Sequence, residues 1–145
     1  MHQYAISNNP DIETLWALLR ASRKVEQVLA QVLQAVELSP TQFDMLMQLE
    51  NTPALTQAQL ARTMLRSPGS AGILIRALEN RGLVSRSPTH ASSNRQPLQL
   101  TSEGQVMISS ARRTLSSCSD LRRFGISTLD GELLSTALQS ILTNE

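Results

Sequence analysis

Residues 54–104 read ALTQAQLARTMLRSPGSAGILIRALENRGLVSRSPTHASSNRQPLQLTSEG and decide the fold. Thr56 is the predicted N-cap of a short helix, and Ser67, with Pro68 at the first helical position, is the predicted N-cap of a second. Gly82 closes the second helix, because glycine readily adopts the left-handed conformation that ends helices. Two short amphipathic helices on either side of so brief a break are typical of a helix-turn-helix.

A β-hairpin is predicted directly after these helices. Residues 83–86 and 98–100 alternate between apolar and polar side chains, as the strands of a half-buried hairpin do, and a polar loop joins them. A hairpin in this place is the wing of a winged helix-turn-helix. The chain is therefore predicted to be mostly α, within the α+β class.

Positive charge is concentrated in the same stretch. Between Ala54 and Thr101 the chain has six arginines and one acid, Glu79, so this stretch carries about +5 while the whole chain carries +1. A surface polarised in this way orients a protein towards a polyanion, and beside a helix-turn-helix it indicates double-stranded DNA. The other interpretation is a solvated helix face. The arginines are Arg62, Arg66, Arg76, Arg81, Arg86 and Arg95.

The remaining composition favours a helical core. Of the 145 residues, 41% are hydrophobic and only 3% are aromatic, so the core must be built mainly from Leu, Ile, Val, Met and Ala on helices. We expect a single domain over residues 1–145. Within it, residues 38–101 are the predicted winged helix-turn-helix lobe, and residues 10–37 and 102–145 are the predicted dimerisation helices.

The chain lacks the marks of several other classes. It has no basic segment followed by an apolar stretch at its start, and no run approaching 18 apolar residues, so we expect a cytoplasmic protein without membrane contact. Cys118 is the only cysteine, and its place in an apolar stripe favours a core position over an oxidant switch. His2 and His90 are scattered, which predicts no metal, no cofactor and no enzyme active site.

The flanking helices carry wide apolar stripes. The first is predicted over residues 10–36 with an Asn8 or Asn9 cap, and two more are predicted after the hairpin, one over 101–125 and one from an Asp130 cap. Their apolar surface exceeds what a small winged lobe can cover. This surplus indicates a homodimer formed by the flanking helices, and the other interpretation is a larger monomeric core.

The second helix of the helix-turn-helix divides into two faces. Helical spacing places its larger apolar residues towards the core and its small and polar residues outside. The small residues of its N-terminal half allow close approach to a DNA major groove. Ala71, Leu74, Ile75 and Leu78 are expected inside, and Gly69, Ser70, Gly72, Ile73, Arg76 and Asn80 are expected on the outer faces.

Several short motifs occur in the order and at the spacing of one bacterial family. Residues 38–43 (LSPTQF), 55–61 (LTQAQLA), 67–70 (SPGS), 78–84 (LENRGLV) and 98–104 (LQLTSEG) resemble the multiple antibiotic resistance regulator (MarR) family of transcription factors. The resemblance covers most of the chain. It implies a homodimer with two winged helix-turn-helix lobes, bound to a palindromic operator. In this family such a protein is commonly a repressor that a small ligand or an oxidant releases.

The wing departs from the family pattern. Family wings usually carry an Asp-x-Arg group, whose acid helps to hold the wing and whose arginine enters the minor groove. Counted back from Leu100, those positions are Ser92 and Asn94 here, and Arg95 comes one residue later. We expect wing contact with DNA at Asn94 and Arg95, with an adjusted loop.

The expected DNA contacts follow from this arrangement. Arg76 is the first choice for a specific contact, forked to a guanine edge or to a phosphate. An exposed Ile73 is explained by contact with a thymine methyl group, or by packing against the wing. Arg81 is equally a solvated helix-end residue. The full expected DNA-binding set is Arg62, Arg66, Ser67, Pro68, Gly69, Ser70, Gly72, Ile73, Arg76, Arg86, Asn94 and Arg95, in which Arg62, Arg66 and Arg86 are interpreted as contacts to the DNA backbone.

The resemblance also implies a ligand site between the dimerisation helices and the DNA-binding lobe. The effector is expected to be a small aromatic or phenolic compound. For Trp16 the other interpretation is core packing, given its helical spacing. The side chains expected at this site are Trp16, Arg20, Met45 and Arg112.

Two functions from different classes agree with the sequence. The favoured one is a sequence-specific DNA-binding regulator, a homodimeric repressor of a palindromic operator that a small molecule releases. The alternative is a winged-helix protein-interaction module whose basic face meets an acidic partner. An enzyme is the weakest hypothesis, because the sequence holds no carboxylate pair with a supporting partner.

Overall fold

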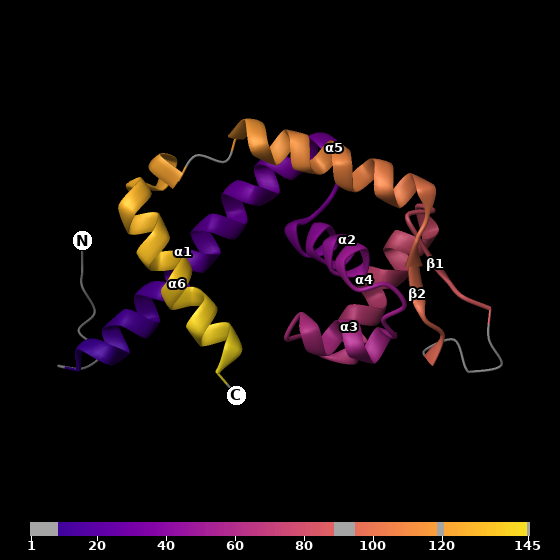
Figure 1. Ribbon diagram of the computed structural model, residues 1–145, viewed down its shortest axis with the longest axis horizontal. Coiled ribbons are helices and arrows are strands. Elements are labelled where there is room, and N and C mark those ends of the chain that lie inside the picture. Colours follow the sequence, from indigo (N-terminus) through magenta and orange to yellow (C-terminus); the bar gives the residue numbers. More distant parts are fainter. Residues whose placement is uncertain (1–8, 89–94, 119–120, 145) are drawn as a thin grey trace. The chain divides into compact units, whose positions relative to one another are not determined.

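A computed structural model describes residues 9–88, 95–118 and 121–144 (Figure 1). The chain divides into two compact units, Met1–Leu115 and Ser116–Glu145. The described elements are mostly helices, with one antiparallel sheet of two strands, so the predicted fold class is confirmed. None of the helices within these ranges has the length and hydropathy needed to cross a bilayer.

The first unit follows the predicted order of elements. A long helix precedes a helix-turn-helix, and a hairpin and another long helix complete the unit. Its elements are α1 (Pro10–Leu33), the 3-10 turn η1 (Gln34–Val36), α2 (Pro40–Asn51), α3 (Gln57–Thr63), α4 (Pro68–Asn80), β1 (Val84–Arg86), β2 (Leu98–Leu100) and α5 (Ser102–Cys118), whose last turn enters the second unit.

The caps of the helix-turn-helix lie where the sequence predicts them. The Thr56 hydroxyl accepts the N–H of Gln59 at 3.3 Å, and the Gln59 side chain accepts the N–H of Thr56 at 2.9 Å. At the start of α4, the Ser67 hydroxyl accepts the N–H of Ser70 at 3.2 Å. Gly82, with φ 71°, follows α4 in the left-handed conformation. Each of the two N-cap hydroxyls satisfies a backbone N–H that the first helical turn leaves without a partner.

The hairpin is held by the loop before α3 as well as by its own pairing. β1 and β2 are antiparallel, with Val84 opposite Leu100. The N–H of Leu98, at the start of β2, donates to the carbonyl of Leu55 at 2.8 Å. The base of the wing is therefore fixed to the entrance of α3.

The core lies within the lobe formed by α2, α3, α4 and the sheet, and α5 closes it. Burial of its apolar side chains is the main favourable term for folding of this lobe. Ile108 of α5 is fully buried here, whereas Val106 is 69% exposed. The largest buried side chains are Leu33, Met45, Leu46, Leu60, Ile75, Leu78, Leu98 and Ile108.

The start of α5 packs directly on the turn that follows α4. The Thr101 hydroxyl donates to the carbonyl of Gly82 and accepts the N–H of Gly104 at 3.0 Å. A Cβ atom at Gly104 would overlap the carbonyl oxygen of Leu83. On the other side of this turn, the Arg81 guanidinium donates to the carbonyl of Glu37. Glycine at 104 is what allows α5 to approach the turn so closely.

The second unit corrects two sequence predictions. The helix predicted over 101–125 ends at Cys118, and a separate 3-10 turn, η3 (Leu121–Phe124), precedes α6 (Thr128–Thr143). The low helix propensity of the serine-rich end of α5 agrees with this break. The cap of the last helix is Ser127 rather than Asp130, because the Ser127 hydroxyl accepts the N–H of Asp130 at 3.1 Å.

The long helices leave apolar side chains exposed. In α1 only the last residue, Leu33, is buried, whereas Leu15 is 61% exposed. On α6, Leu133 is 66% exposed. Other large apolar residues exposed on these two helices are Ile12, Trp16, Leu19, Val25, Leu129, Leu134, Ile141 and Leu142.

Candidate nucleic-acid interface

The N-terminal half of α4 presents the outer face that the sequence predicts. Ile73 is 71% exposed, and Arg76 is exposed one turn further along. Ser67, Pro68 and Gly69 are exposed at the start of the helix, and Ser70 is half-buried. A Cβ atom at Gly69 would meet nothing within 4 Å, so the approach to this end of α4 is open.

Gly72 does not belong to that outer face. The structure buries it, and the prediction that places it among the outer residues is wrong. A Cβ atom at Gly72 would lie 2.5 Å from Nε2 of Gln57, on α3. The physical reason is that α3 crosses α4 here, and the Gln57 side chain occupies the space above the glycine.

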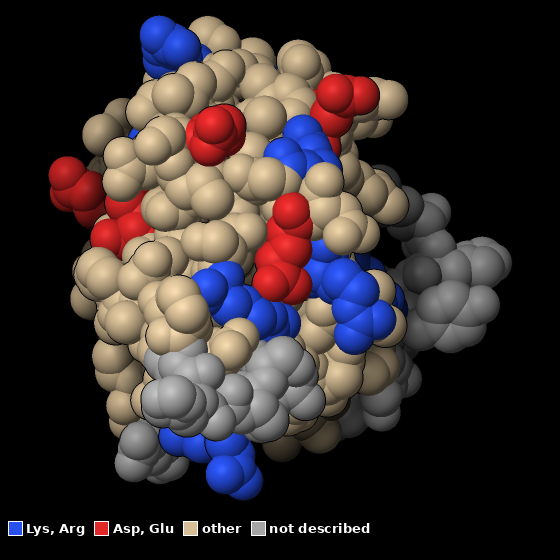
Figure 2. Space-filling model, turned by 90° about the vertical axis from the view of Figure 1, so that its right-hand side faces the viewer, with Lys and Arg blue, Asp and Glu red and all other residues tan. Residues whose placement is uncertain are grey.

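Basic side chains are present over much of the face that Figure 2 shows. In its lower part the charged side chains are Lys and Arg, and in its middle and upper parts Lys and Arg stand beside acidic side chains. Arg62, Arg66 and Arg95 are all exposed. The Arg66 guanidinium donates to the Thr41 hydroxyl at 2.9 Å, which places it beside the start of α2. Arg81 is held at the end of α4 through its bond to Glu37, consistent with its helix-end interpretation.

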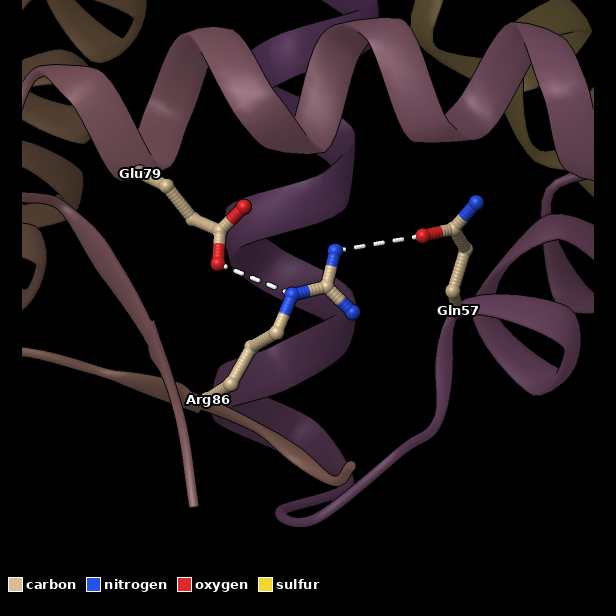
Figure 3. A network of polar contacts seen from close by, with 3 residues as sticks. All are labelled: Gln57, Glu79 and Arg86. Carbon is tan, nitrogen blue, oxygen red and sulfur yellow. Dashed lines mark hydrogen bonds and ion pairs between the residues drawn. The ribbon is translucent and has the colours of Figure 1, made fainter. Parts of the chain in front are cut away.

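Arg86 has a different environment from the other arginines. Its Nε lies 2.9 Å from Oε1 of Glu79, and its Nη2 donates to Oε1 of Gln57 at 3.2 Å (Figure 3). Its side chain is 15% exposed and that of Glu79 is 27% exposed. Gln57 in turn donates from Nε2 to the carbonyl of Pro68 at 3.1 Å. The guanidinium therefore has protein partners on α3 and α4, and its interpretation as a contact to the DNA backbone stays a prediction.

Sequence reasoning missed Gln57 and Glu79 as members of this group. Gln57 follows the cap of α3, and glutamine is an ordinary residue type in the first turn of a helix. Its partners are 11 and 29 residues away in the chain, as the two hydrogen bonds record. Only Gly72, a glycine inside a helix, gives a signal in the sequence that something approaches closely at this point.

Part of the predicted wing lies outside the described residues. Asn94, together with Ser92, belongs to the segment 89–94, so the structure does not describe their positions. Arg95 is the first described residue after it, and it is exposed.

The residues expected at a ligand site have distinct environments. Met45 is fully buried in the lobe core. The Arg112 guanidinium forms an ion pair with Glu50 of α2. Trp16 and Arg20 lie on the exposed part of α1.

The structure also has an open groove of about 510 Å³ between η1 and the first half of α5. Apolar side chains form much of this groove, and Glu37 and Glu103 also line it. The groove residues include Val36, Glu37, Leu83, Glu103, Val106 and Met107. None of Trp16, Arg20, Met45 and Arg112 lines this groove.

Across the described ranges, no group of three or more His, Cys, Asp and Glu side chains is placed to bind a metal ion.

The family model of the MarR family matches residues 38–93, which include α2, α3, α4 and β1. The chain carries a MarR-family domain. The predicted resemblance is confirmed, and with it the general assignment as a DNA-binding transcriptional regulator of the MarR family. A search of the curated proteins found no match.

Solved structures of MarR-family proteins share this fold over nearly the whole chain. The transcriptional repressor CouR, bound to p-coumaroyl-CoA, is 23% identical with a TM-score of 0.81, over 100% of this chain and 99% of that one. A MarR-family regulator from Rhodococcus sp. RHA1 is 23% identical with a TM-score of 0.80, over 96% and 100%. CouR bound to a 23-mer DNA duplex is 25% identical with a TM-score of 0.76, over 98% and 95%.

Proposed function

We propose that this MarR-family protein is a homodimeric repressor that binds a palindromic operator and is released by a small molecule. The observation that carries the proposal is the open outer face of α4, where Ile73 and Arg76 are exposed inside a lobe with a strong excess of arginine. A helix with this face, entering the major groove, reads base edges while the surrounding arginines bind phosphates.

The exposed apolar side chains of α1 and α6 support the homodimer. A monomer with such stripes would leave Leu15 and Leu133 in water, at a cost set by their apolar area. A second copy of the chain carries the same apolar stripes, so two copies can cover each other's stripes in a symmetric dimer. Two lobes related by a two-fold axis then address two half-sites about one helical turn apart, roughly 34–36 Å.

The exposed residues divide into two kinds of DNA contact. Arg76 is proposed to fork to a guanine edge, and Ile73 to contact a thymine methyl group. Arg62, Arg66 and Arg95 are proposed to bind phosphates, which position the lobe without reading sequence. The start of α4 is proposed to approach the DNA backbone closely, through Ser67, Pro68, Gly69 and Ser70.

The release by a small molecule is proposed from the surroundings of α1. Trp16 offers an exposed aromatic face and Arg20 a nearby cation on the same helix, a combination that suits a small aromatic acid. The structure of CouR with p-coumaroyl-CoA shows that this fold accommodates an aromatic acyl compound in another protein. We include Arg112 in this proposed site and leave out the buried Met45.

Selection of DNA from a randomised duplex library tests the proposal most directly. We expect enrichment of a palindrome with half-sites about one turn apart, followed by tight binding in fluorescence anisotropy. The logarithm of the affinity should fall steeply with the logarithm of salt concentration, by about 0.9 for each neutralised phosphate. Enrichment of no palindrome, together with a shallow salt dependence, would contradict the repressor and favour the protein-interaction module.

A further inference from the structure

We infer that Gln57 and Arg86 are positioning residues that hold the recognition helix α4 in its DNA-reading pose, and that they govern operator affinity without contacting DNA. The inference rests on the proposed function. It assigns to this partly buried polar group, Gln57, Glu79 and Arg86, a part in recognition that the exposed residues alone do not supply.

The group connects the two ends of α4 through neighbouring elements. Gln57 of α3 donates to the carbonyl of Pro68, the first residue of α4. The same side chain accepts from Arg86 of β1, and Arg86 is ion-paired with Glu79, the last residue but one of α4. A continuous polar path therefore runs from the start of the recognition helix to its end, over α3 and the wing strand, and Figure 3 shows its part from Gln57 to Glu79.

The Gln57 amide has little freedom in this arrangement. Its oxygen and its nitrogen are both engaged, at 3.2 Å and 3.1 Å from their partners. Exchange of the two amide atoms would face Nε2 towards the guanidinium, donor against donor, so the contact with Arg86 also fixes the donor that reaches α4. Since affinity depends on how well a binding surface is preorganised, removal of this bond lowers affinity even though every group that touches DNA is kept.

A substitution at Gly72 separates the proposed effect on DNA affinity from an effect on protein stability. A Cβ atom there would meet Nε2 of Gln57, which is side chain and not backbone, so the helix can accept alanine when the amide breaks its hydrogen bonds and rotates away. Alanine is the better helix former, which favours the folded state. The added methyl group points at α3 and not at the outer face, so it meets no DNA.

The central experiment therefore compares Gly72→Ala and Gln57→Ala with the wild-type dimer on the selected operator. We expect each variant to bind about tenfold more weakly, because each breaks the bond to Pro68. The melting temperature of Gly72→Ala should be unchanged or raised. Its salt slope should equal that of the wild type, because the same phosphates are neutralised. The double variant should bind no more weakly than the weaker single variant, since the two changes remove the same hydrogen bond.

Glu79→Gln tests the other end of the group. Removal of an acid from a basic DNA-binding lobe should strengthen DNA binding if charge alone matters. The inference predicts weaker binding instead, because Arg86 loses its ion pair. Gln105→Ala, a change at an exposed glutamine of α5, is the matched control and should leave affinity unchanged.

Hydrogen exchange of the first turn of α4 in the free protein gives a readout without DNA. We expect faster exchange over residues 69–73 in Gly72→Ala and Gln57→Ala. If wild-type protein selects no operator while this exchange is faster, the proposed function fails and the positioning of α4 stands. If wild-type protein binds its operator and the variants bind equally well, the inference is overturned. It is also overturned if only Arg86→Gln weakens binding and lowers the salt slope, since Arg86 is then a phosphate contact.

Discussion

The winged-helix lobe buries its apolar side chains, whereas the outer helices, α1 and α6, expose many of theirs. In the lobe, Leu46, Leu60 and Leu98 are fully buried, and the chain itself supplies everything that covers them. On α1 and α6, Leu15 and Leu133 remain mostly exposed. The lobe is thus complete as a packed structure, whereas α1 and α6 each carry exposed apolar side chains. Substitutions on α1 and α6 can therefore be made without disturbing the packed core of the lobe.

The largest effect is expected from the outer helices. Leu133→Glu combined with Leu142→Glu places charges on the exposed stripe of α6, where burial against a second copy becomes unfavourable. We expect a folded monomer in sedimentation equilibrium and an operator affinity lower by about a thousandfold, because the two half-sites are no longer bound as one unit.

The matched control for that pair is Leu65→Gln, a change at an exposed leucine between α3 and α4. It should leave the dimer intact. A dimer that persists in the α6 variant would show that this stripe is not the interface, and would remove the contrast between lobe and outer helices.

Within the lobe, the next largest effect is expected at Gly104. Gly104→Ala introduces a Cβ atom against the Leu83 carbonyl, and backbone on both sides cannot move aside cheaply. We expect the free energy of unfolding in urea to fall by about 2–3 kcal/mol. Gly69→Ala, where the added atom meets nothing within 4 Å, should be neutral or stabilising. Equal stabilities of the two variants would contradict the close contact between α5 and the turn after α4.

Arg76→Ala distinguishes a residue that contacts DNA bases from the residues that position α4. We expect a loss of about 2 kcal/mol that is confined to operators with the preferred base at one position. Anisotropy titrations with a panel of single-base operator variants measure this. A loss that is uniform across the panel would make Arg76 a phosphate contact. Thermal stability should not change, because Arg76 is exposed.

The smallest effect is expected from a phosphate contact alone. Arg62→Gln should weaken binding to all sequences alike and lower the salt slope by about 0.9 for each phosphate that the variant no longer neutralises. Arg113→Gln, at an exposed arginine of α5, carries the same change of charge outside the lobe face and should leave the slope unaltered. Similar slopes for both variants would show that net charge, and not position, governs the salt dependence.

The parts of the fold that depend on neighbouring residues were predictable from the sequence. Thr56 and Ser67 cap their helices through bonds that span three residues, so the signal and its effect lie within one turn. Gly82 is the same kind of signal at the other end of α4.

Features that depend on distant residues were not predictable in this way. Ile108 is buried and Val106 is exposed because the close approach of Gly104 to the turn after α4 sets how α5 rests on the lobe. Gly72 is buried because α3 crosses it, and Arg86 is partnered because two segments far away in sequence meet it. In each case the deciding interaction joins elements whose distance in space the periodicity of one helix does not encode.

The hydrogen bond from the Leu98 N–H to the Leu55 carbonyl also bears on how such a regulator diversifies. It anchors the returning strand at its base, independently of the residues that connect the strands. Sequence changes between the two strands therefore leave this anchor in place, so the connecting chain can diverge while the base of the wing is kept.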